Sequence, residues 1–183
     1  AFDILYHEHL LYYRYETLRK LLRMYDLEVF HIYRADVHGG SIIVYVGKLG
    51  HWKQDQTVAA FQNEEKINHY DKYQTYQVFG TAVEKLGKRI RRLVQDLNEK
   101  GSRIYAYGAP AKGTVLLNYC QLTNDEIPIA VEKNSMKFGR YIPGTGIAIK
   151  DENVVDEPNY YLMLPWNFQS EFCSGEEYKS GRR

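Results

Sequence analysis

The sequence predicts an α/β protein: a Rossmann-like three-layer unit with a mostly parallel sheet, preceded by a helix-plus-hairpin segment and a long helix. After Gly101, short apolar runs alternate with helical patterns, and such alternation is typical of parallel sheets covered by helices on both faces. Before that point, helix-spaced leucines are followed by β-rich runs and then by a long apolar stripe with helical spacing.

The N-terminal half supplies the helix-plus-hairpin segment. Residues 9–25 predict an amphipathic helix because apolar side chains recur at helical spacing, at Leu10, Tyr13, Leu18, Leu21 and Leu22. The runs at 27–37 and 41–49 are β-rich and are joined by His38-Gly39-Gly40. A Gly-Gly pair between such runs favours an antiparallel hairpin, although a loop between distant strands is the alternative.

A long helix is predicted from about residue 71 to 100, after a polar stretch at 51–70 with a short helical patch. Its apolar stripe alternates spacings of four and three, at Phe79, Val83, Leu86, Ile90, Leu93 and Leu97. Beyond it, RIYAYGAPAKGTVLLNYC reads as strand, tight turn and helix, and further strands are expected in IPIAVEKN, GIAIK and NYYLMLPW.

This pattern divides the chain into residues 1–70, an N-terminal segment with the YHEH motif and the hairpin, and residues 71–183, the long helix plus the Rossmann-like domain. The chain starts without methionine and ends after a helical pattern that no strand follows. We therefore expect a longer protein that continues at both ends, with residues 1–70 forming the link to a further domain.

Composition narrows the functional classes. A formal net charge of +1 gives no electrostatic reason to expect nucleic acid as a partner. No run approaches the ~18 apolar residues needed to span a membrane, so no membrane partner is expected. Cys120 and Cys173 show neither a metal-ligand nor a disulfide-framework spacing, which favours reduced thiols and a cytoplasmic location.

The first candidate site is Tyr6-His7-Glu8-His9, which interrupts an apolar stretch where a strand is expected to pass into a helix. Strand ends in α/β sheets are common ligand sites, and a histidine beside a carboxylate is a competent general base near neutral pH. Zinc is the competing interpretation, but the motif lacks a further ligand at a suitable spacing. We therefore predict no metal site.

Two glycine-containing loops are further candidates. The turn from Gly108 to Gly113 leads from a strand into a helix and suits a phosphate, with Lys112 adding a full charge, although a turn that serves only packing fits equally well. Arg140 and Tyr141 in GRYIPGTG could grip a phosphate or a sugar, the alternative being an ordinary solvated turn. His38 is either a turn residue or a ligand contact.

Several motifs together carry a family resemblance. In this order and spacing, FDILYHEHLLYYRYETLRKLL, VHGGSIIVYV, YGAPAKGTVLLNYC, KFGRYIPGT and LMLPWN resemble the C-terminal domain of the S-adenosylmethionine-dependent sugar C-methyltransferase family. The resemblance implies a substrate that is a deoxysugar linked to a nucleotide diphosphate and methylated next to its ketone. It also implies an N-terminal zinc-binding module and a central domain that holds S-adenosylmethionine. Neither is expected here, because the chain has no cysteine-rich segment and no glycine-rich cofactor loop followed by an acidic strand end.

By the resemblance, Tyr6, Glu8 and His9 are catalytic: His9 is the general base, Glu8 orients it or shares its role, and Tyr6 donates to the developing oxyanion. His7 has no assigned role. The candidate substrate-binding residues are His38, Gly108, Lys112, Asn118, Arg140 and Tyr141. Without the cofactor domain, this polypeptide alone is expected to be inactive.

Two other functional classes remain open. In a non-catalytic nucleotide or sugar-phosphate binding domain, the turn at 108–113 and the loop at 139–146 would hold the ligand, and the YHEH motif would be structural. In a dimerisation module, the stripe of the helix at 71–100 would pair with another chain, although one such helix more often packs on its own domain.

Overall fold

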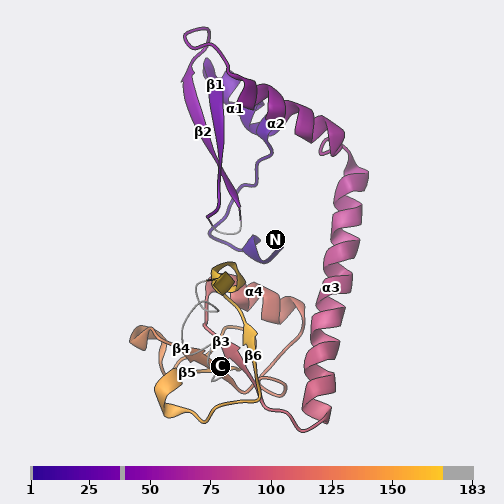
Figure 1. The fold of residues 1–183 in the computed structure, drawn as a ribbon, viewed down its shortest axis with the longest axis vertical. Coiled ribbons are helices and arrows are strands. Elements are labelled where there is room, and N and C mark those ends of the chain that lie inside the picture. The colour runs from indigo at the N-terminus through magenta and orange to yellow at the C-terminus, as the bar shows by residue number, and fades with distance from the viewer. Residues whose placement is uncertain (1, 38–39, 171–183) are drawn as a thin grey trace. The chain divides into compact units, whose positions relative to one another are not determined.

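The computed structural model describes residues 2–37 and 40–170 (Figure 1). They belong to two compact units. We call residues 10–82 the hairpin unit, and we call the described parts of 1–9 and 83–183 the sheet unit. Each unit has an apolar core of its own.

The hairpin unit contains helices α1 (Tyr15–Arg23) and α2 (Gln56–Ile67) and strands β1 (Leu27–Ala35) and β2 (Ser41–Lys48). The strands pair antiparallel, in a register that joins Leu27 to Lys48 and Ala35 to Ser41. The predicted hairpin is therefore confirmed. Its core consists of Tyr15, Val29, Ile32 and Val58, against which Leu22, Val44 and Phe61 pack.

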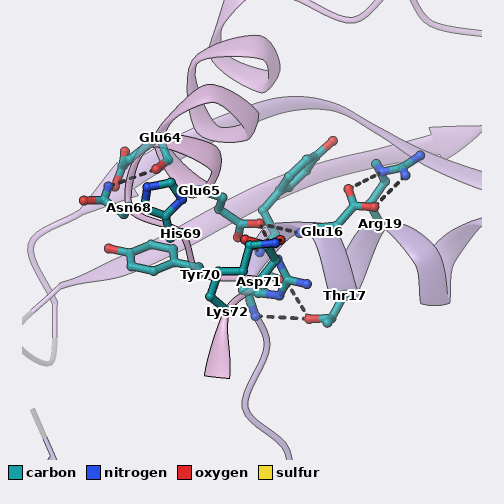
Figure 2. Close-up of polar contacts among 12 residues, drawn as sticks. Glu16, Thr17, Arg19, Glu64, Glu65, Asn68, His69, Tyr70, Asp71 and Lys72 are labelled. Atoms are coloured by element: carbon teal, nitrogen blue, oxygen red, sulfur yellow. Dashed lines mark hydrogen bonds and ion pairs between the residues drawn. The ribbon is translucent and has the colours of Figure 1, made fainter. Parts of the chain in front are cut away.

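A carboxylate of α2 caps the start of α1 (Figure 2). Glu65, which is only 9% exposed, accepts the backbone N–H groups of Tyr15 and of Glu16, the latter at 3.1 Å. Arg14 lies 3.6 Å from the same carboxylate. Because the first N–H groups of a helix have no partner inside it, this contact fixes where α1 begins.

The prediction of a helix over residues 9–25 is therefore wrong at its start. Residues 9–14 are not helical, and Leu10 is 84% exposed. Helical spacing alone placed Leu10 and Tyr13 on a buried face. The boundary is set instead by the cap from Glu65, 50 residues away from Tyr15, together with the hydrogen bond of the Arg14 N–H to the Thr17 hydroxyl at 3.2 Å.

The sheet unit is a parallel sheet with helices. Its strands are β3 (Ile104–Tyr107), β4 (Ile129–Glu132), β5 (Ala148–Asp151) and β6 (Tyr160–Met163), and helix α4 (Ala111–Tyr119) follows β3. The strand order is β5-β4-β3-β6 and every pair is parallel. In chain order within the unit, this places the first strand between the second and the fourth. The predicted α/β, Rossmann-like fold class is thus confirmed.

The core of this unit lies around the sheet and includes Ile104, Leu117, Ile127, Ile147 and Leu164, all nearly inaccessible to solvent. Helix α3 (Tyr73–Glu99) begins in the hairpin unit and ends in the sheet unit, which confirms the predicted long helix. Only one half of its stripe, Val83, Ile90 and Leu97, packs against the sheet core. The other half, Phe79, Leu86 and Leu93, is exposed.

The first residues belong to the sheet unit as well. Phe2–Ile4 form the 3₁₀ helix η1, and the Phe2 ring, 8% exposed, lies 4.9 Å from the Tyr119 ring of α4. The expectation that YHEH follows a strand is therefore wrong, because a 3₁₀ turn packed on α4 precedes it. Throughout the described part of the chain, every helix is too short or too polar to cross a membrane.

Candidate functional site

The YHEH motif forms a turn directly after η1. The backbone N–H of His9 donates to the carbonyl of Tyr6 at 2.9 Å, and the two rings lie with centroids 4.5 Å apart. The Nδ1 atom of His9 lies 2.7 Å from the carbonyl oxygen of Ile4. A carbonyl only accepts, so Nδ1 carries the proton and the lone pair of the neutral ring is on Nε2. The side chains of Glu8 and His9 are exposed.

A chain of polar contacts joins η1 to the predicted phosphate turn. The buried carboxylate of Asp3, 4% exposed, accepts the indole N–H of Trp166 at 2.6 Å. The Lys112 ammonium lies 4.6 Å from the centre of that indole ring and donates to the side-chain oxygen of Asn167. Burial lowers the pKa of Lys112, and the nearby charge of Asp3 partly opposes this shift. Sequence motifs far apart in the chain thus meet at Lys112.

The turn itself is held in a shape that favours glycine. Gly108 has a φ of +76° and donates its N–H to the Val131 carbonyl at 2.7 Å. A Cβ at this position would lie 3.1 Å from the Pro165 ring. Helix α4 starts three residues later, and the N–H groups of its first turn and its dipole favour an anion there.

A hollow of about 250 Å³ lies beside this turn. Its walls come from the end of β3 and the turn (107–110), from the end of β4 (131–133), and from Lys137, Glu152, Pro165 and Phe168. The ends of β3 and β4 are the carboxyl ends of neighbouring parallel strands, and they lie at the crevice where the strand order reverses. Open α/β sheets bind ligands at this place. Gly108 lines the hollow. Lys112 lies outside it, next to the segment that carries Pro165 and Phe168.

Glu132 is the residue of this site that sequence reasoning missed. It ends β4 and lines the hollow, although no acidic strand end was expected. One carboxylate oxygen accepts the N–H groups of Lys133 and Asn134 at 2.9 and 3.2 Å. The other accepts the Ala109 N–H at 3.1 Å and the Lys137 ammonium at 2.8 Å. The signal that could have found it is an acid closing the strand that follows the glycine turn.

The surroundings of Glu132 also determine its charge. Burial acts to raise the pKa of this carboxyl group, but the hydrogen bonds from Lys137 and from the backbone N–H groups of Asn134, Lys133 and Ala109 outweigh it. The net pKa is therefore below the usual value, and Glu132 is an anion. A carboxylate has about four lone-pair directions, and four donors of the chain already point at this one.

That occupancy bears on S-adenosylmethionine. In dinucleotide-binding folds of this type, the acid in this place accepts from the ribose hydroxyl groups of the ligand. The lone pairs of Glu132 are engaged with Ala109, Lys133, Asn134 and Lys137 instead. The described residues of this strand end do not fit the ribose of the cofactor.

Arg140 and Tyr141 lie at a different place. They line a second hollow, of about 470 Å³, together with Phe138, Lys150 and Val154. Their segment pairs with the edge strand, because Tyr141 bridges to Ala148 at the start of β5. The structure thus does not bring Arg140 into the hollow that Gly108 lines.

The remaining candidates have other surroundings. The Asn118 amide donates to the carbonyls of Thr114 and Pro143 at 2.8 and 3.0 Å, and so ties α4 to the loop of Arg140. His38 lies outside the described residues. Within the ranges 2–37 and 40–170, no group of three or more His, Cys, Asp or Glu side chains is placed to hold a metal ion.

The strand order, the turn after the first strand and the hollow at the carboxyl ends define a Rossmann-like α/β unit of the ligand-binding type. The chain belongs to the family described as the C-methyltransferase C-terminal domain, which matches residues 36–182. This finding confirms the resemblance drawn from the motifs, at the level of a C-methyltransferase domain.

A curated relative agrees with the family. The chain is 33% identical over 179 residues to C-methyltransferase NovU from Streptomyces niveus, a match that covers 96% of this chain. The match covers 43% of NovU, so the chain spans less than half the length of this relative.

Proposed function

We propose that this chain is the part of an S-adenosylmethionine-dependent C-methyltransferase that anchors a nucleotide-diphosphate deoxysugar and removes the proton next to its ketone. One observation carries the proposal: the segment that bears YHEH is bonded, through Asp3 and Trp166, to the lysine of the glycine turn. Groups suited to proton transfer and a lysine suited to a diphosphate thus belong to one compact unit.

The anchoring part uses the strand end. The diphosphate would lie at the first turn of α4, where N–H groups, the helix dipole and Lys112 favour negative charge. Gly108 allows the backbone to approach the ligand closely, since its φ of +76° is a conformation that other residues adopt only with strain. The base of the nucleotide would enter the hollow beside it, whose walls include Tyr107 and Phe168, and its ribose would make no hydrogen bond to the engaged carboxylate of Glu132.

The chemical part uses the turn after η1. Removing a proton from carbon next to a ketone requires a base and a donor for the oxygen that becomes negative. With its Nδ1–H held by Ile4, His9 presents the Nε2 lone pair as the base. Tyr6, whose ring lies against that of His9, donates a hydrogen bond from its hydroxyl group to the oxyanion, and Glu8 orients His9 or shares its role. S-adenosylmethionine, held by another part of the longer protein, would supply the methyl group.

The decisive test is hydrogen exchange in a full-length family enzyme with a non-reactive cofactor analogue bound. The unchanged enzyme should incorporate solvent deuterium at the carbon next to the ketone. His9→Asn should slow this exchange by about 10²–10⁴-fold, the usual contribution of a general base. His7→Asn is the matched control and should exchange normally. Undiminished exchange in His9→Asn would remove His9 as the base, and no exchange in the unchanged enzyme would count against removal of the proton ahead of methyl transfer.

The anchoring role has a separate test. Lys112→Ala should raise KM and leave kcat nearly unchanged, because a phosphate contact exists equally in the ground state and the transition state. Arg140→Ala is the comparison, since Arg140 lines the other hollow. A larger rise in KM from Arg140→Ala than from Lys112→Ala would move the anchor to the edge of β5.

A further inference from the structure

Asp3 and Trp166 lie beside Lys112, the lysine of the glycine turn, and neither is a candidate for contact with substrate. The Asp3 carboxylate is 4% exposed, and its hydrogen bond to the Trp166 indole is 2.6 Å long. The face of the same indole lies 4.6 Å from the Lys112 ammonium. One side chain thus contacts the start of the chain with its N–H edge and the turn lysine with its ring face.

We propose that Asp3 and Trp166 are positioning residues for Lys112: Asp3 fixes the indole, and the indole holds the ammonium group at the phosphate turn. The inference rests on the proposed function, in which Lys112 binds the diphosphate. Because Asp3 belongs to η1, directly ahead of the YHEH turn, the same linkage sets the place of the anchor and of the groups that move the proton.

The arrangement needs both contacts. A lysine side chain has many rotamers, and binding an anion with a mobile ammonium group costs the entropy of ordering it. An indole face attracts a cation, but only if the ring itself is oriented. Trp166 lies in the short helix η4 (Trp166–Phe168) and is 37% exposed, so packing leaves more than a third of it uncovered and does not by itself fix the ring. The charge-assisted bond to Asp3 supplies the missing constraint.

The first measurement needs no ligand: titration of the Lys112 side chain by NMR in this chain. The charge of Asp3 raises the pKa of Lys112, so Asp3→Asn, which keeps an oxygen to accept the indole N–H, should lower it. Asp125→Asn, an exposed aspartate of the same unit, is the matched control and should leave the titration unchanged. An unchanged Lys112 titration in Asp3→Asn would show that the Asp3 carboxylate does not lie near the ammonium group, which would overturn the proposed linkage.

The second measurement is calorimetric titration of the chain with inorganic pyrophosphate, the group shared by nucleotide diphosphates. Asp3→Ala and Trp166→Phe, which each delete the bond, should weaken binding by about threefold to tenfold, the effect of one net hydrogen bond. Asp3→Asn should stay close to the unchanged chain. Trp52→Phe, at the other of the two tryptophans, should have no effect.

The outcomes separate the two proposals. If Lys112→Ala weakens pyrophosphate binding but Asp3→Ala and Trp166→Phe do not, the positioning role is wrong and the anchoring role remains. If Lys112→Ala has no effect, the anchoring role is wrong and the positioning role loses its purpose. Should the chain alone bind no pyrophosphate, the NMR titration and the KM of full-length Trp166→Phe decide, with an unchanged KM counting against the proposal.

Discussion

The ring of His9 donates its Nδ1–H to the carbonyl oxygen of Ile4 over 2.7 Å. This contact determines the tautomer of the ring, and it links the YHEH turn to the last residue of η1. It reaches back five residues along the chain, so it needs no partner from any other domain.

The tautomer can be observed directly. Nitrogen NMR of the chain, at a pH where His9 is neutral, should show the proton on Nδ1 and not on Nε2, since only Nδ1 faces the Ile4 carbonyl. A proton on Nε2 would contradict the arrangement and would remove the lone pair that the proposed base requires.

Glu132 leads to a prediction on the cofactor. Because the four lone-pair directions of its carboxylate are engaged by the chain itself, we expect calorimetric titration of this chain with S-adenosylmethionine to show no appreciable binding. Micromolar affinity would contradict this prediction. If it were found, Glu132→Ala would show whether the cofactor lies at this strand end, because binding there should depend on the side chain.

The lowered pKa of Asp55 predicts that the start of α2 loses stability in acid. Hydrogen bonds from the side chains of Thr57 and His31 lower its pKa to about 2. A carboxylate with a lowered folded-state pKa stabilises the fold above its unfolded pKa of ~3.9. We expect this contribution to disappear as the pH falls from about 4 to about 2. Hydrogen exchange in α2 should show the loss in the unchanged chain and in the control Asp36→Asn. Asp55→Asn should remove this pH dependence, because the asparagine side chain still accepts the helix N–H but does not titrate.

Two helix glycines should respond differently to replacement by alanine. At Gly80 in α3, a Cβ would meet nothing within 4 Å, so Gly80→Ala should stabilise the fold by about 0.5–1 kcal/mol through helix propensity. At Gly113 in α4, a Cβ would lie 2.8 Å from Leu164 Cδ1 and 2.9 Å from Leu164 Cβ. Overpacking of this kind costs about 1–3 kcal/mol, so Gly113→Ala should be neutral to destabilising. Urea unfolding measures both, and a clear stabilisation by Gly113→Ala would contradict the packing described here.

The cap that Glu65 of α2 forms on α1 should contribute more to the free energy of unfolding than an exposed ion pair nearby. Glu65→Gln presents an NH₂ group to one of the two backbone N–H donors, so it should cost about 1.5–3 kcal/mol, the range for hydrogen bonds to charged groups. Its neighbour Glu64 pairs with Arg34 at the surface, and Glu64→Gln should cost at most ~1 kcal/mol. Faster hydrogen exchange at Tyr15 and Glu16 would locate the loss. Equal effects of both variants would contradict the capping role.

Much of the fold could be predicted from local sequence. The alternation of strand and helix patterns after Gly101 gave the parallel sheet, because buried strands and amphipathic helices leave different periodicities in the sequence. The Gly-Gly pair predicted the hairpin because glycines between two β-rich runs favour a turn. The start of α1 escaped prediction because its cap, Glu65, is distant in sequence.

The candidate site was less accessible to sequence reasoning. The stretch from Gly108 to Gly113 could be recognised as a strand-to-helix turn because its glycines and proline are local signals. The contact of Lys112 with Trp166 and Asn167 could not be predicted, because the spacing of residues within a motif does not say which distant loop will pack against that motif. The separation of Arg140 from that turn follows from strand order, which places β5 at the sheet edge, beyond β4.

The bond between Asp3 and Trp166 joins residues 163 positions apart, while the hairpin unit is one continuous stretch, residues 10–82. During synthesis the hairpin unit can fold as soon as it emerges, but Phe2 must wait for a core whose last strand ends at Met163. Contacts of such high sequence separation form slowly, because a long loop must close before they are gained. Refolding should therefore show an early phase for the hairpin unit and a late one for the sheet unit, with the YHEH turn reaching its final place in the late phase.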